Sequence, residues 1–437
     1  MTLNPIPGEL GMPFLGESRS IFGNPIAYAR SHHAQYGEIV RTRFLGRAGV
    51  VLISAAAQRY VIVEQASNFS WHAGYGMGED LFGDALFMID DPEHAFQRKL
   101  MTPAFTAKAL ATYQPAIDMI AKAKLAEWTT RQTIDLYPFA REITFRLSAT
   151  LLAGVDPDFD QRLFQRLFTQ LMAGATQIIR KDIPGTTYSK ALHARRQLEP
   201  MLRRLIAQRR EQPTTDALGL LVGARDEQGQ ALSDNQLVGL AITLIFAGFE
   251  STSGTLTWLL VELLQSPTWY QAAQEACAGD SDAPITDEVV RVQPLLDAMI
   301  DETLRLHPAT PLLMRGAVAD FSFGGYTMTA GTQVFLMPGY TQRRADYFAA
   351  PDTFNPQRFL DGDEERNHPY AYVGFGGGSR SCIGSGVAKR EVKTVLMNIL
   401  RRYDLTLIPG QNFTPRRFPL NQPTSDARVV LRPRQGA

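Results

Sequence analysis

The sequence is poor in the residues that build disulfide scaffolds and zinc sites. Only two cysteines, Cys277 and Cys382, occur among 437 residues, and neither belongs to a C-x-x-C pair or to a cysteine and histidine cluster at zinc spacing. A disulfide-stapled fold and a structural zinc site are therefore excluded. Because so few cysteines fit a reducing compartment best, we expect a cytoplasmic protein.

An excess of either charge is also lacking, since 44 basic residues balance 44 acidic ones. Such a chain offers no broad positive surface to a polyanion, which argues against nucleic-acid binding. Prolines and glycines interrupt the apolar residues of positions 1–17. We therefore expect neither a signal sequence nor a membrane span at this end of the chain.

One cysteine lies in a glycine-rich stretch, residues 375–384, which reads F-G-G-G-S-R-S-C-I-G. The three glycines at 376–378 let the backbone turn tightly and approach a flat ligand. Residues 385–402 have helical composition, so we expect Cys382 at a helix N-terminus, where the dipole and free amides favour a thiolate. A thiolate is an axial ligand of haem iron. A buried free cysteine is the alternative for an isolated cysteine.

A second candidate site begins at D-P-E-H-A-F-Q-R, where Asp91 and Pro92 are suited to the N-cap and first turn of a helix. His94 and Arg98 follow four residues apart, so they share one helix face. A solvated pair on an exposed face is the alternative to a pair that binds an anion.

Residues 233–266 form the longest helical pattern, and its middle is apolar on nearly every side, which predicts a helix through the interior. A carboxylate at Glu250 is costly there unless it is paired or used in chemistry. The hydroxyls of Ser251 and Thr252, together with Gly248, are expected to loosen or bend the helix. A kinked core helix with a salt-bridged Glu250 is the alternative.

A further helix is predicted over residues 293–307, with Glu302 and Arg305 one turn apart on one face. An exposed ion pair of this kind is common and contributes little. The later segment F-N-P-Q-R-F contains Arg358.

Together these motifs resemble the cytochrome P-450 superfamily. H-x-x-x-R, E-x-x-R and the F-x-x-G-x-R-x-C-x-G haem loop occur here in the family's order, and between the first two A-G-F-E-S-T resembles the family's A-G-x-[DE]-T-[ST]. The resemblance implies a mainly α cytochrome P-450 fold with a small β-rich region. It places haem b (iron protoporphyrin IX) between the long central helix and the cysteine loop, and makes residues 1–437 a single haem-thiolate monooxygenase domain.

The resemblance also assigns roles to particular side chains. Cys382 would bind the iron, and Glu250 with Ser251 or Thr252 would deliver protons. The family usually has threonine where Ser251 stands, so which of the two hydroxyls serves stays open. Further residues would contact the haem, three of them (His94, Arg98 and Arg315) as propionate donors: His94, Arg98, Ala247, Arg315, Phe375, Gly376, Arg380 and Gly384. Glu302, Arg305 and Arg358 would form a buried structural network.

The implied activity is insertion of one oxygen atom from O2 into a C–H or C=C bond. Three stretches, residues 6–17, 37–47 and 216–233, are similar to cyanobacterial retinoid hydroxylases. We therefore expect an elongated apolar substrate: a retinoid, another isoprenoid or a fatty acid. A peroxide-driven peroxygenase of the same fold and a non-catalytic haem sensor are the alternatives. Residues expected to line the substrate pocket are Phe87, Met88, Phe246, Leu312, Leu313 and Phe418.

Because no length remains for a flavin or ferredoxin domain and no dinucleotide or P-loop fingerprint occurs, electrons are expected from a separate ferredoxin or flavodoxin with its reductase. An acidic partner would dock on the face of the cysteine loop through four basic residues: Arg380, Lys389, Arg390 and Lys393.

Overall fold

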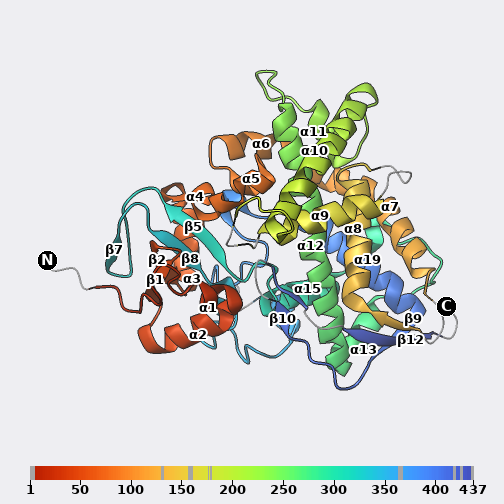
Figure 1. Ribbon diagram of the computed structural model, residues 1–437. Helices are drawn as coiled ribbons and strands as arrows, with labels where there is room; N and C mark the ends of the chain where they lie inside the picture. Colours follow the sequence, from red (N-terminus) through yellow and green to blue (C-terminus); the bar gives the residue numbers. More distant parts are fainter. Residues whose placement is uncertain are drawn as a thin grey trace.

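The computed structural model describes residues 5–128, 132–155, 161–175, 177, 180–362, 368–416, 420–423 and 427–434. Helices dominate, as predicted. Residues 18–75 lie on one side of the molecule with the largest sheet, and most of the longer helices lie on the other side around α12 (Asp234–Gln265) (Figure 1).

The largest sheet has the strand order β1-β2-β8-β5-β3, and only the β2–β8 pair is parallel. Its first two strands are neighbours in the sequence and pair antiparallel. Successive side chains of a strand point to opposite faces, so the sheet separates two apolar clusters. The strands are β1 (Ile39–Phe44), β2 (Arg47–Leu52), β3 (Phe69–Ser70), β5 (Leu313–Ala317) and β8 (Gln333–Leu336).

Three smaller sheets complete the β structure. A three-stranded sheet joins the chain's end to the helical side, and two hairpins lie elsewhere. Their strands are β4 (Thr133–Asp135), β9 (Tyr403–Leu407) and β12 (Arg428–Pro433); β6 (Phe321–Phe323) and β7 (Tyr326–Met328); β10 (Pro415–Arg416) and β11 (Gln422–Pro423).

The central helix, α12 (Asp234–Gln265), opens with a capping box between Ser233 and Gln236 and is buried over most of its length. It is the one helix of the described chain long and apolar enough to cross a membrane, but 78% of its apolar window is buried inside the protein. The predicted interior helix is therefore confirmed. The helix continues without interruption past Gly248, and the Ser251 hydroxyl bonds back to the Ala247 carbonyl, as a loosened or bent helix would have it.

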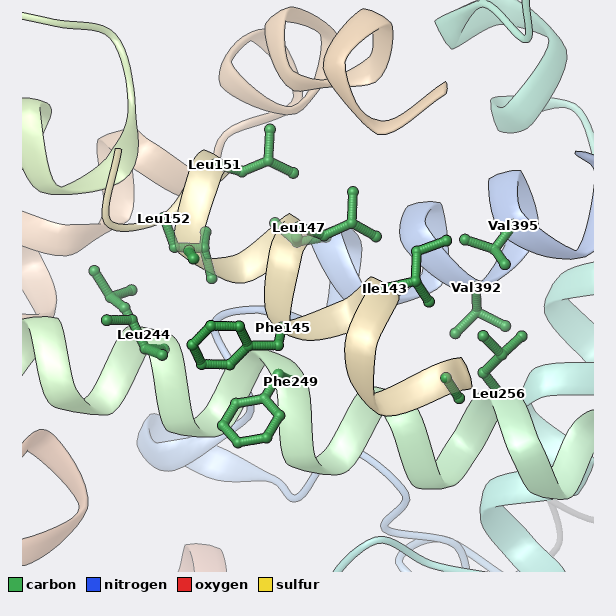
Figure 2. Packing of buried hydrophobic residues seen from close by; sticks show 14 of the residues in the cluster. Ile143, Phe145, Leu147, Leu151, Leu152, Leu244, Phe249, Leu256, Val392 and Val395 are labelled. Carbon is green, nitrogen blue, oxygen red and sulfur yellow. The ribbon is translucent and has the colours of Figure 1, made fainter. Parts of the chain in front are cut away.

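Helix α8 (Leu136–Leu151) packs along α12 on one side. Figure 2 shows Phe145 of α8 above Phe249 of α12, and their rings meet edge to face at 5.2 Å. A Cβ at Gly248 would lie 2.5 Å from the Ser148 hydroxyl, so this glycine serves close helix packing. Farther along α12, Leu256 lies beside Val392 of α19 (Figure 2).

The remaining helices surround this pair and α19 (Ser385–Arg402). Residues 71–88 form three short helical elements: α4 (Trp71–Tyr75), α5 (Glu79–Phe82) and the 3-10 turn η4 (Leu86–Met88). The longer helices are α2 (Pro25–Tyr36), α6 (Glu93–Met101), α7 (Ala107–Leu125), α9 (Gln161–Ala175), α10 (Thr187–Glu211), α13 (Pro267–Ala276) and α15 (Pro294–Leu306).

A buried ion network ties α15 to the loop before the cysteine segment. Arg305 donates to both oxygens of Glu302 at 2.7 and 2.8 Å, and Arg358 donates to the same carboxylate at 3.2 Å. Glu302 and Arg305 are fully buried, so their pair is not the exposed one considered above. Arg305 also donates to the backbone carbonyls of Gln342 and Pro351, which pins the intervening loop.

Candidate active site

A cavity of about 350 Å³ opens between α12 and the cysteine loop. Its wall is mostly apolar and draws on segments far apart in the chain: the short helices at 71–88, α12, the second half of α15, the turn at 308–310, strand β5, residues 373–376, and the loop and helix from Arg380 to Val392. A concave apolar space with a few polar groups is typical of a small-molecule site.

Cys382 lies on this wall, three residues before the first residue of α19. Its own amide donates to the Phe375 carbonyl at 2.8 Å, which closes the loop. The side chain is surrounded by protein yet open to the cavity. Burial raises the pKa of its thiol, while the backbone amides of Gly384 and Ser385 and the charge of Arg98 lower it. The expected position is found, but burial outweighs the helix terminus and favours the thiol in the ligand-free chain.

Two glycines shape the cysteine loop. Gly376 and Gly378 have φ angles of +72° and +61°, which residues with a Cβ rarely adopt. A Cβ on Gly378 would lie 2.6 Å from the carbonyl oxygen of Ile62, so the loop can rest on that segment only without a side chain. Phe375 and Gly384 both line the cavity beside Cys382.

Behind this wall the structure gathers a histidine and three arginines. His94 is buried on α6 and contacts Asp91 at 3.2 Å, and burial together with Arg380 lowers the pKa of its imidazole to about 4. The helix begins at Glu93, with Pro92 rather than Asp91 at the N-cap. Arg98, one turn on, reaches the Ser381 hydroxyl at 3.4 Å.

Two more arginines flank a tryptophan of the cavity wall. The Arg315 guanidinium lies 3.5 Å from the centre of the Trp71 ring, and that of Arg380 lies 5.5 Å from it. Arg315 is buried, donates to the Met314 carbonyl and forms no salt bridge within the described chain; burial lowers its pKa to about 10. Arg380 donates to the Ile89 carbonyl at 2.7 Å.

The described chain places too few carboxylates beside the three arginines to neutralise their charge. Asp90 and Asp91 approach Arg380 only to 3.9 and 3.7 Å. A buried, unpaired cation is costly, so the arrangement favours an anionic ligand. The propionates of a haem held on Cys382 match this charge, and the glycine loop leaves room for a flat ring. The residues present therefore fit the group, although of these four side chains only Arg380 itself reaches the cavity.

On the α12 side, Ala247, Ser251 and Thr252 line the cavity, but Glu250 does not. The Ser251 hydroxyl donates to the Ala247 carbonyl at 2.7 Å. That of Thr252 bonds to no other described residue. Glu250 instead turns toward α8, where its two oxygens accept bonds from Arg141 at 2.8 Å and from Gln422 at 2.5 Å.

Of the predicted pocket residues, Phe87, Phe246 and Leu313 lie on the cavity wall. Leu312 does not: it points to the opposite face of the sheet, into the cluster of Ile21 and Phe335. Met88 is buried in the main core, also away from the wall. These two expectations were wrong. Phe418 lies outside the described residues, whereas Leu420, two positions on, lines the cavity.

Glu391 of α19 was not anticipated from the sequence. It lines the cavity and is 1% exposed, and neither carboxylate oxygen bonds to another described residue. Burial raises the pKa of this carboxyl well above its ordinary value. A signal was present, because Glu391 interrupts the apolar stripe of α19 between Val387 and Val395, at i+4 spacing from each.

The basic patch predicted as a docking site is neutralised. Lys389 pairs with Asp301 at 2.7 Å, Arg390 with Asp287, and Lys393 with Asp297 at 3.0 Å. Lys393 is also buried, and Arg380 points inward. These side chains hold α19 against α14 (Asp287–Arg291) and α15, so the expected free positive face is not there.

A cavity-facing cysteine on a glycine loop, backed by unpaired buried arginines in a mainly α fold, defines a haem-thiolate protein. The family model for Cytochrome P450 matches residues 6–431. The chain therefore belongs to the cytochrome P450 family, and its cofactor is haem b.

Individual relatives agree. The chain is 31% identical over 429 residues to "Putative cytochrome P450 120" of Synechocystis, covering 97% of this chain and 96% of that protein. It is 29% identical over 402 residues to "Abscisic acid 8'-hydroxylase 2" of Arabidopsis thaliana, covering 90% and 83%. A solved structure, "Retinoic acid bound cyanobacterial CYP120A1", superposes with a TM-score of 0.90 at 29% identity, covering 99% of this chain and all of that one.

Proposed function

We propose that this cytochrome P450, an oxidoreductase of the monooxygenase type, acts on an elongated apolar molecule, namely a retinoid, another isoprenoid or a fatty acid. The observation that carries the proposal is the apolar wall opposite Cys382, built by Phe87, Phe246 and Leu313 among others. Retinoic acid and abscisic acid, which the names of the relatives contain, are both isoprenoid carboxylic acids, and this supports the same class.

Cys382 is the proposed iron ligand, with Gly376 and Gly384 leaving space for the ring. When bound, haem supplies the O2 chemistry that inserts one oxygen atom into a C–H or C=C bond. The hydrogen-bond donors behind the wall (His94, Arg98, Arg315 and Arg380) are proposed to hold the propionates. The Glu302, Arg305 and Arg358 network keeps the loop before the cysteine in place.

Glu250 and a neighbouring hydroxyl form the proposed proton route. Ser251 and Thr252 both face the cavity, and the two differ in what they bond to. The Ser251 hydroxyl is fixed by the Ala247 carbonyl and keeps its acceptor capacity, whereas the Thr252 hydroxyl is free to rotate. The carboxylate of Glu250 must turn from Arg141 and Gln422 to serve them. An acid beside a hydroxyl supports an O2-driven reaction over a peroxide-driven one.

The proposed partners are O2 and a separate ferredoxin or flavodoxin with its reductase. A single domain over residues 1–437 and a cytoplasmic location complete the proposal. The apolar cavity supports an enzyme over a haem sensor, because a sensor needs no lined substrate space.

Three measurements test the proposal. The reduced, carbon monoxide-bound protein should show a thiolate-type spectrum, and Cys382→Ala should abolish it. Retinoic acid or a long-chain fatty acid should shift the haem spectrum by displacing water. With a surrogate ferredoxin and reductase, the bound ligand should then be hydroxylated. A thiolate-type spectrum that survives Cys382→Ala would contradict the ligand assignment, and the absence of binding by any of these ligands would contradict the substrate class.

A further inference from the structure

The acid of the proposed proton route is held by a segment that also forms part of the cavity wall. Gln422 donates to one oxygen of Glu250 at 2.5 Å, and Arg141 donates to the other at 2.8 Å. Both oxygens are thereby occupied, and Glu250 is 6% exposed and absent from the cavity lining. The carboxylate is stored beside the cavity rather than in it.

The segment carrying Gln422 crosses α12 at close range. The indole nitrogen of Trp258 donates to the Asn421 carbonyl at 3.3 Å. A Cβ on Gly254 would lie 3.1 Å from that same carbonyl, so the glycine permits the approach. The segment thus packs on α12 about one turn beyond Glu250. The carbonyl of Asn421 lies against Gly254 and is held by the hydrogen bond from Trp258.

The same segment touches the substrate space. Leu420 lines the cavity, and the Asn421 amide donates to the carbonyl of Ala309, another residue of the cavity wall, at 2.9 Å. A ligand that pushes Leu420 or Ala309 therefore also moves the backbone of Asn421. The next residue, Gln422, carries the side chain that bonds to Glu250.

From this juxtaposition we infer that Gln422 is a positioning residue, which keeps Glu250 away from the cavity until ligand contact at Leu420 displaces the segment. The inference deepens the proposed function and rests on the role proposed there for Glu250. Arg141 holds the other oxygen of Glu250 from α8, and it is not among the residues that line the cavity. The bond from Gln422 is the one expected to respond when a ligand fills the cavity.

The test compares Gln422→Ala with Gln411→Ala in the haem-loaded protein. Gln411 is a matched control, because it bonds to the backbone of Ile408 and Arg428 in the same C-terminal region and not to Glu250. A hydrogen bond to a charged group shifts an equilibrium by roughly ten- to hundred-fold. With surrogate ferredoxin and no ligand, Gln422→Ala should raise O2 consumption about ten-fold, and Gln411→Ala should leave it unchanged.

A second readout does not depend on turnover. In the wild type, saturating retinoic acid or palmitic acid, whichever shifts the haem spectrum, should speed hydrogen–deuterium exchange at the Asn421 amide. Unchanged exchange at Asn421 would overturn the inference, and so would a ligand-free rate in Gln422→Ala equal to that of the control. If neither acid binds, the ligand-free rates alone decide.

Glu250→Gln separates the two levels of the argument. Loss of product with this variant, combined with a silent Gln422→Ala, leaves the proton route intact and refutes only the role of Gln422. Full product formation by Glu250→Gln refutes the route and the inference together. Reduced, carbon monoxide-bound spectra confirm that each variant has folded around its haem.

Discussion

Replacing Glu391 by glutamine should stabilise the protein, and the gain should grow with pH. The side chain is buried against the cavity with no hydrogen bond from the described residues, so the folded state keeps it protonated. In the unfolded chain the carboxyl ionises with an ordinary pKa near 4.5. Folding at higher pH therefore requires proton uptake, which glutamine does not need.

The magnitude follows from the same linkage. A group whose folded pKa is raised costs nothing below its unfolded pKa, and the cost increases as pH rises until the folded pKa is reached. Each pH unit contributes about 1.4 kcal/mol, so between the ordinary pKa and pH 7 the ceiling is about 3 kcal/mol. An unpaired amide and an unpaired carboxylic acid cost similar amounts to bury, so that contribution largely cancels.

Urea unfolding of wild type and Glu391→Gln, followed by circular dichroism between pH 5 and pH 8 at equal haem content, measures the difference. The free energy of unfolding should favour the variant, with the smaller gap at pH 5. Glu211→Gln, an exposed site at the end of α10, is the matched control and should show no such trend. A gap that is absent, reversed or independent of pH would refute the reasoning.

Three other predictions concern the buried ion network, the cysteine loop and the hydroxyls of α12. Glu302→Gln removes the charge between two buried guanidinium groups and should lower the free energy of unfolding by about 3–5 kcal/mol, measured by urea unfolding. Gly378→Ala adds a Cβ 2.6 Å from the Ile62 carbonyl at a φ of +61°, so it should reduce haem retention during gel filtration; retention equal to wild type would contradict this. Ser251→Ala and Thr252→Ala, compared by product formed per O2 consumed, should show which hydroxyl serves: the variant with the lower yield identifies it, and equal yields would contradict a single relay.

The sequence predicted the features that depend on local spacing. The cysteine loop and the buried helix through Glu250 both follow from glycine positions and apolar periodicity, and each lies where expected. The Glu302 and Arg305 pair was likewise visible at i+3 spacing, although its burial was inferred only through the resemblance.

The wrong predictions concern features that depend on which face of a sheet a side chain points to, or on partners distant in sequence. Leu312 and Leu313 are neighbours, and because strand side chains alternate, only one of them can face the cavity. The acid partners of Lys389, Arg390 and Lys393 come from a segment about 90 to 100 residues earlier, so the patch looked unpaired when read alone. The turn of Glu250 toward Arg141 required the packing of α8 on α12.

The position of Trp71 gives the molecule a built-in optical probe. Its ring forms part of the cavity wall and lies between two guanidinium groups, so an acceptor chromophore seated there would quench its emission by energy transfer. Since the chain has only four tryptophans, a Trp71→Phe comparison isolates this signal. The entry of haem into the cavity can then be followed in real time during reconstitution, without a measurement of product.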